Sequence, residues 1–170
     1  MRANEAPDRI GTYPRIVLRD YCYMGCPYCP ELVPNDSEFH GIYFTTFQHS
    51  EYWPYDTRRK TYLSSTFALG FQSQENIVNQ HVSQRIYEGL AYGCIVLTNS
   101  RPAVEQTENC CLLVTTREEV EDQMRFFKSH PDLLQERQRR GYEFCRRTGT
   151  NDKTVDLLLE TIQHTVGVRP

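Results

Sequence analysis

The sequence predicts an α/β fold: a single domain with a parallel sheet, closed by helices at its C-terminal end. Residues 60–100 read in turn as a strand, a polar loop, a helix and a second strand, which is the order of an α/β unit. Residues 94–97 (CIVL) form a short, unbroken apolar run, as expected for a parallel strand buried on both faces. The last third of the chain carries the start and stop signals of consecutive helices.

The first forty residues hold the fewest signals of regular structure. Residues 1–14 are polar and contain prolines, and residues 15–18 (RIVL) predict one short strand. Three prolines fall within residues 21–39, so we expect a loop there. The sequence therefore predicts an irregular segment with a cysteine-rich loop over residues 1–40 and the folded domain over residues 41–170.

Two further strands precede the helix of the central unit. Residues 41–47 are rich in β-branched and aromatic residues, and residues 61–71 contain a second strand that ends at a polar loop over residues 72–81. Apolar residues then recur at four-residue spacing, which marks one face of a helix: Val82, Ile86 and Leu90. Gly93 is expected to end this helix before the next strand begins.

The C-terminal third predicts three helices. Thr116 is the first residue of a capping box that opens one of them. Pro131 suits the first turn of the next helix, which we expect to run to about Arg147. Asn151 or Asp152 is expected to cap the last helix. Its apolar residues fall on one stripe: Val155, Leu158, Leu159 and Ile162.

The residues that suit a ligand gather where the polar loop meets the helix at Val82. A helix N-terminus at the carboxyl end of a parallel strand presents unpaired N–H groups to anions. Arg85 can bind phosphate oxygens through two parallel hydrogen bonds, and Glu88, about one turn later, can accept from the two hydroxyls of a ribose. The same two residues also fit an ordinary surface ion pair worth about 0.2–0.5 kcal/mol, so both interpretations stay open.

Residues 81–100, HVSQRIYEGLAYGCIVLTNS, resemble the donor-binding half of GT-B glycosyltransferases, in which an arginine, a glutamate and a small-residue segment precede an apolar strand. Residues 67–85 are similar to fucosyltransferases of the same architecture, and the downstream helices follow in the same order. The resemblance covers roughly the last two thirds of the chain. It implies a Rossmann-like domain equivalent to one half of GT-B.

The resemblance also implies roles for particular residues. Arg85 would be the catalytic residue that stabilises the leaving diphosphate, and Glu88 would bind the ribose. Gln80 stands where many members carry a second glutamate near the transferred sugar, which is a departure from the family pattern. The donor-binding set that the resemblance implies is Gln80, His81, Val82, Ser83, Arg85 and Glu88.

The partners implied by the resemblance are a nucleotide-sugar donor, either a UDP- or a GDP-sugar, and a sugar acceptor with a reactive hydroxyl. No other cofactor is expected. A GT-B enzyme needs two Rossmann-like domains facing a cleft, and the general base usually comes from the other domain. At 170 residues this chain would supply one domain, so we expect a glycosyltransferase whose activity needs a second domain or chain.

Composition excludes several classes of partner. The formal net charge of −3 gives no positive field for nucleic acid. No apolar run approaches the roughly 20 residues that span a bilayer, and the N-terminal residues lack the apolar core of a signal peptide. Seven cysteines, several of them in apolar runs, fit a reducing compartment. We therefore expect a cytoplasmic protein.

One motif competes with this interpretation. Cys22, Cys26 and Cys29 have the CxxxCxxC spacing with which radical S-adenosylmethionine enzymes hold a [4Fe–4S] cluster. The same thiolates could hold zinc, with His40 as a fourth ligand. A third alternative is a non-catalytic Rossmann-like interaction subunit, which the glutamine at position 80 would permit. A plain cysteine-containing loop remains the simplest interpretation of the motif.

Overall fold

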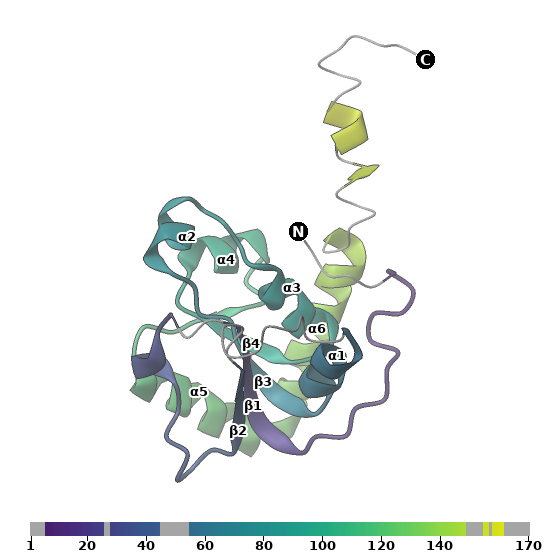
Figure 1. Ribbon diagram of the computed structural model, residues 1–170. Coiled ribbons are helices and arrows are strands. Elements are labelled where there is room, and N and C mark those ends of the chain that lie inside the picture. The colour runs from purple at the N-terminus through teal and green to yellow at the C-terminus, as the bar shows by residue number, and fades with distance from the viewer. Residues whose placement is uncertain (1–5, 26–27, 45–54, 149–154, 157, 162–170) are drawn as a thin grey trace.

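The computed structural model describes residues 6–25, 28–44, 55–148, 155–156 and 158–161. Its centre is a five-stranded sheet in which every neighbouring pair of strands is parallel, with the order β2-β1-β3-β4-β5 (Figure 1). The strands are β1 (Arg19–Met24), β2 (Gly41–Phe44), β3 (Ser65–Leu69), β4 (Ile95–Thr98) and β5 (Leu112–Leu113). The fold is therefore the predicted α/β, Rossmann-like domain with a parallel sheet.

Helices cover both faces of this sheet. They are α1 (Tyr55–Leu63), α2 (Gln74–Val78), α3 (Gln84–Ala91), α4 (Arg101–Gln106), α5 (Arg117–Ser129) and α6 (Pro131–Thr148), with a 3-10 turn, η1, at Pro30–Leu32. One hydrophobic cluster joins the sheet to α1, α3, α4 and α6, and a second joins it to α5 and η1. Figure 1 shows α5 on the opposite side of the strands from α1 and α6. The inner strand β4 is thus fully buried between two helical layers, as the apolar run at residues 94–97 indicated, whereas the edge strands β2 and β5 are only partly buried.

The strand order contains one reversal, between β1 and β3. From β1 the chain moves outward to β2, then returns past β1 to β3 and continues in the other direction to β4 and β5. The loops after β1 and β3 therefore diverge to opposite sides of the sheet. In open parallel sheets, ligands bind beyond the carboxyl ends of the strands at such a switch point.

The predictions for the N-terminal segment were wrong in one respect. The strand expected at residues 15–18 is absent from the described chain, where Ile16, Val17 and Leu18 are more than half exposed. The strand is β1, which lies at the centre of the sheet and occupies the beginning of the expected loop over residues 21–39. Successive side chains of β1 enter the two hydrophobic clusters in turn, and this burial on both faces stabilises the strand. The prolines of the expected loop do not interrupt it, because the first of them comes only after the strand has ended.

Three helices were not expected. Helix α1 carries mostly charged and polar residues, so no apolar period marks it, and it occupies the start of the strand segment expected at residues 61–71. Helices α2 and α4 have only 5 and 6 residues, and each begins at a serine whose hydroxyl caps it: Ser73 and Ser100. Strand β3 and, over residues 41–44, strand β2 confirm the sequence-based expectation; residues 45–47 of the second expected strand lie outside the described residues.

Helix α3 packs closely on the sheet because position 89 is glycine. A Cβ atom at Gly89 would lie 2.8 Å from Cγ2 of Val96 and 3.1 Å from Cβ of Ala68. The helix ends at Ala91, just before Gly93, whose φ of +80° is in the left-handed region that favours glycine; the predicted stop is confirmed. The close approach sets where the first turn of α3 lies relative to the ends of β1 and β3.

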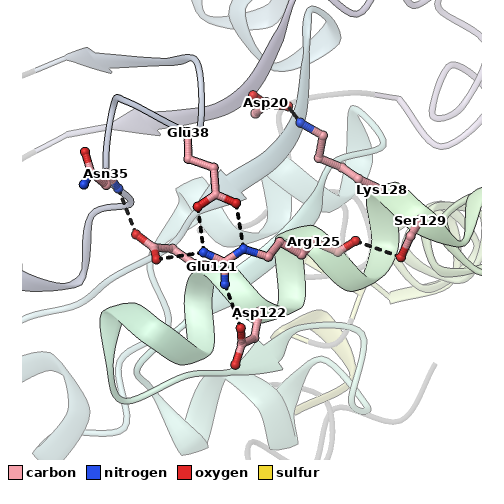
Figure 2. Close-up of polar contacts among 8 residues, drawn as sticks. All are labelled: Asp20, Asn35, Glu38, Glu121, Asp122, Arg125, Lys128 and Ser129. Atoms are coloured by element: carbon pink, nitrogen blue, oxygen red, sulfur yellow. Dashed lines mark hydrogen bonds and ion pairs between the residues drawn. The ribbon is translucent and has the colours of Figure 1, made fainter.

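Helix α5 holds the segment between β1 and β2 through a row of polar side chains (Figure 2). Arg125 pairs with Glu38 through two hydrogen bonds, at 2.6 Å from Nε and 2.7 Å from Nη2. Glu121 accepts from the backbone nitrogen of Asn35 at 3.0 Å. Lys128 pairs with Asp20 at 2.6 Å. We call these contacts the α5 clamp; the segment they fasten begins at the loop that follows β1.

The C-terminal helices follow the prediction as far as residue 148. The hydroxyl of Thr116 accepts from the backbone nitrogen of Glu119, and α6 begins at Pro131. The expected caps Asn151 and Asp152, and Ile162 of the stripe, lie outside the described residues. The remaining stripe residues are each more than half exposed: Val155, Leu158 and Leu159. Within the described chain, the helices lack the combination of length and apolar character that a membrane crossing needs.

Candidate functional site

Gln72 lies three residues after the end of β3 and organises the switch point. Its backbone nitrogen donates to Oδ1 of Asn99 at 2.8 Å, and Nδ2 of Asn99 donates back to the carbonyl oxygen of Gln72 at 3.0 Å. The same Nδ2 also lies 3.3 Å from Sγ of Cys29. Three loops, after β1, β3 and β4, are thereby tied together at the carboxyl edge of the sheet.

The side chain of Gln72 reaches the start of α3. Its Oε1 accepts a hydrogen bond from the backbone nitrogen of Ser83 at 3.0 Å, and the residue is fully buried. Its Nε2 is buried without a hydrogen-bond partner among the described residues. Because a buried amide group normally finds a partner, this nitrogen is a donor that a ligand oxygen can satisfy.

Arg85 crosses the same space from the first turn of α3. Its Nε donates to the hydroxyl of Ser83 at 3.1 Å, and its guanidinium lies over the rings of Tyr23 and Tyr28, with centroids at 6.0 and 5.8 Å. Nη1 is buried and unpartnered within the part of the chain that the structure describes. A Cβ atom at Gly25, whose φ is +127°, would lie 2.8 Å from this Nη1, so the glycine leaves room for the guanidinium.

The N-terminus of α3 is open. Ser83 has the extended backbone of an N-cap, yet among the described residues its hydroxyl makes no capping hydrogen bond, because it accepts from Arg85 instead. The early N–H groups of a helix carry the positive end of its dipole. An anion at this end of α3 would therefore meet backbone donors, Nη1 of Arg85 and Nε2 of Gln72 together.

Glu88 lies one turn further along α3 and is 3% exposed. Nε2 of Gln84 donates to its Oε1 at 2.8 Å, and Nη2 of Arg58, on α1, lies 3.5 Å from the same oxygen. Burial raises the pKa of the Glu88 carboxyl, while the charge of Arg58 and the hydrogen bond from Gln84 oppose that rise. The sequence left open an exposed ion pair between Arg85 and Glu88. In the described contacts Glu88 instead pairs with Arg58.

The other residues expected to bind the donor lie at the turn between α2 and α3. Gln80 and His81 are exposed; the carbonyl oxygen of Gln80 accepts from Gln106, and the backbone nitrogen of His81 donates to Asn76. Val82 is buried in the hydrophobic cluster beneath α3. The structure thus brings Ser83, Arg85 and Glu88 to one end of α3 and sets Gln80 and His81 on the turn before it.

Four residues of this site were missed by sequence reasoning. Asn99 follows directly on β4 and Gln72 lies three residues after the end of β3, so the rule that ligands bind at the carboxyl ends of parallel strands could have found them. Tyr23 lies on β1, which was taken for a loop. Arg58 had no signal, because α1 was not predicted.

The cysteine motif is divided between the two sides of the sheet. Cys22 is fully buried in the cluster beneath α3, with Sγ 3.7 Å from the carbonyl oxygen of Phe67. Cys29 packs against the cluster on the α5 side, with Sγ near the carbonyl oxygen of Gln72. Cys26 lies outside the described residues. Among the residues that are described, no three His, Cys, Asp or Glu side chains are grouped so that they could hold a metal ion.

A family model described as glycosyl transferase-like matches residues 30–160, which include every strand except β1 and all of the residues discussed on α3. No curated protein matches the chain.

Proposed function

Because the chain belongs to the glycosyl transferase-like family, we propose that the crevice at the β1/β3 switch point binds the nucleoside diphosphate part of a sugar nucleotide, whose sugar is transferred to an acceptor hydroxyl. Family membership supports a glycosyltransferase type of function. The donor itself, a UDP- or GDP-sugar, is the proposal.

The observation that carries the proposal is the pair of unpartnered, buried donors at the start of α3. Nε2 of Gln72 and Nη1 of Arg85 both lie beside the open helix N-terminus at Ser83. A buried donor left unpaired costs about 1–3 kcal/mol, more when the group is charged. A diphosphate supplies several negatively charged acceptor oxygens, so its binding would give both unpaired donors a hydrogen-bond partner. The positive end of the α3 dipole would stabilise its charge as well.

Each part of the donor then has a residue of suitable chemistry. The diphosphate lies against Arg85 and the first N–H groups of α3, and the ribose hydroxyls donate to the carboxylate of Glu88. The uncharged Gln80 and the neighbouring His81 lie on the exposed turn before the helix, on the side where the transferred sugar would extend.

The chemical step breaks the bond between the anomeric carbon and the terminal phosphate oxygen and forms a bond from that carbon to the acceptor oxygen. Negative charge develops on the departing diphosphate. In this proposal Arg85 and the α3 terminus stabilise that charge, and donors that are fixed before the reaction do so without rearrangement. The acceptor proton passes to a general base, which we propose a second Rossmann-like domain or chain supplies. A cytoplasmic location stays a prediction.

A thermal-shift titration tests donor binding. UDP, GDP, CDP, ADP and dTDP are titrated against the wild-type chain, Glu88→Ala and Arg85→Met, with Arg139→Met on the exposed face of α6 as the control. A nucleotide at 100 times its Kd contributes about 2.7 kcal/mol, which raises Tm by about 5–10 °C for a domain of this size. We expect one nucleotide to stabilise the wild type and the control, and to stabilise Glu88→Ala and Arg85→Met less. No shift with any of the five would contradict the proposal.

A further inference from the structure

Arg58 and Glu88 form an ion pair that links two helices beside the proposed donor site. Nη2 of Arg58, on α1, lies 3.5 Å from Oε1 of Glu88, on α3, and the two side chains are 24% and 5% exposed. The Nε of Arg58 is buried and has no partner within the described chain. Glu88 alone therefore does not satisfy the guanidinium, and its contact with Arg58 is at the long end of an ion pair.

Glu88 needs such a partner more than an exposed glutamate does. Removing a carboxylate from water favours its neutral, protonated form, and burial raises the pKa of Glu88 accordingly. The groups that face it are Arg58 and Tyr62 from α1 and Gln84 from its own helix. Of these, Arg58 alone brings a positive charge, since burial raises the pKa of Tyr62 and keeps that phenol neutral.

We propose that Arg58 is a positioning residue for the donor ribose: its guanidinium holds the buried Glu88 carboxylate ionised and fixed between α1 and α3. The inference rests on the proposed function, because it takes Glu88 as the ribose ligand. An ionised carboxylate accepts from two adjacent hydroxyls at once, whereas the protonated form carries a hydrogen of its own and loses one of those acceptors. Arg58 acts through Glu88 and need not touch the nucleotide.

The consequence is a pH dependence of nucleotide binding that Arg58 controls. If binding requires ionised Glu88, the affinity falls as the pH drops below the Glu88 midpoint. Loss of an opposite charge at this distance moves a carboxyl midpoint upward by about one unit or more. Arg58→Met should therefore bind about tenfold more weakly than wild type on the acid side, and the two should converge at high pH.

The test is a series of calorimetric titrations between about pH 5 and pH 9 with the nucleoside diphosphate that stabilises the wild type best. Arg58→Lys restores the charge and should return the midpoint toward that of wild type. Arg59→Met is the matched control, because it removes the same charge from the next position of α1, where Arg59 pairs with the exposed Asp56 and lies over the ring of Tyr13, away from Glu88. We expect its profile to overlay that of wild type. A loss in Arg58→Met that is equal at every pH, or no loss, would overturn the inference.

A measurement without ligand separates this inference from the proposed function. The difference in stability between the wild type and Glu88→Gln is followed against pH, and again in the Arg58→Met background. The midpoint of that difference should move to higher pH when Arg58 is replaced. An unmoved midpoint beside intact nucleotide binding would overturn the role of Arg58 alone. Absence of nucleotide binding in the wild type would overturn the ribose role together with the proposed function.

Discussion

The side chain of Gln72 joins the end of β3 to the start of α3 through one hydrogen bond, from the backbone nitrogen of Ser83 to Oε1 at 3.0 Å. The bond fixes the first turn of α3, and with it Arg85, relative to the sheet. It also leaves Nε2 of the same amide buried without a hydrogen-bond partner in the described chain. One side chain thus both builds the site and presents a donor to it.

Gln72→Leu tests the structural half of this role. Leucine fills a similar volume but cannot accept from Ser83, so a part-buried N–H loses its partner. An orphaned N–H costs about 1–3 kcal/mol, but the substitution also removes the unpaired Nε2 and its cost, so we expect the free energy of unfolding, measured by urea denaturation, to fall by less than that. Gln135→Leu, on the exposed side of α6, should leave stability nearly unchanged. Equal effects of the two substitutions would contradict the role assigned to Gln72.

Gly25→Ala tests whether the space beside Arg85 matters for binding. The new Cβ would lie 2.8 Å from Nη1 of Arg85, and the φ of +127° is unfavourable for alanine, so both stability and nucleotide affinity should fall. Gly11→Ala is the matched control: its φ is +80°, but its Cβ would meet the ring of Tyr142. It should lower Tm and leave the nucleotide Kd as in wild type. A Kd unchanged in Gly25→Ala would place the ligand elsewhere.

Glu88 should give the domain a stability that falls as pH rises. Its pKa is raised by burial in the folded state, so the folded chain holds the proton more tightly than the unfolded chain does. The free energy of unfolding therefore declines from about pH 4.3, the ordinary glutamate value, up through the raised folded pKa, and stays lower above it. Relative to Glu88→Gln, the wild type should lose stability over this window in urea titrations. If the stability of the wild type relative to Glu88→Gln instead rose with pH over this window, the raised pKa of Glu88 would be contradicted.

The α5 clamp should act locally. Because Arg125 and its partner Glu38 are both exposed, breaking their ion pair is expected to change global stability little. Arg125→Met should instead speed hydrogen exchange of backbone amides in residues 31–40, above all that of Asn35, whose nitrogen donates to Glu121. The control Arg139→Met removes a comparable exposed ion-pair network within α6 and should leave this segment as in wild type. Slower or unchanged exchange in Arg125→Met would show that the clamp does not hold the segment.

The elements that the sequence predicted correctly are those with a strong local pattern: an apolar run, an apolar stripe or a helix cap. The run at residues 94–97, the stripe of Val82, Ile86 and Leu90 and the cap at Thr116 each carry a local signal that packing then confirmed. The prediction missed strand β1 because the burial of this strand depends on pairing with β2 and β3, which are distant in sequence. The nearby prolines gave a stronger local signal, and that signal indicated a loop. Local pattern cannot show which strand a tertiary contact will place at the centre of a sheet.

For the site, sequence located the end of α3 but not what surrounds it. Ser83, Arg85 and Glu88 share one helix, so spacing alone grouped them. Gln72, Asn99 and Arg58 come from three other elements, and only the sheet order brings them to the same edge. The burial of Glu88, which decides its protonation, likewise depends on α1, a helix without an apolar period.

The central claim, that a diphosphate lies between Arg85 and the start of α3, is tested most directly by comparing nucleoside diphosphate with nucleoside monophosphate of the same base. Calorimetry gives the Kd of both for the wild type and Arg85→Met. A charge-assisted hydrogen bond is worth about 1.5–3 kcal/mol, so Arg85→Met should weaken the diphosphate about 10- to 100-fold and the monophosphate much less. Equal weakening of both ligands, or none, would contradict the assignment of Arg85 to the diphosphate.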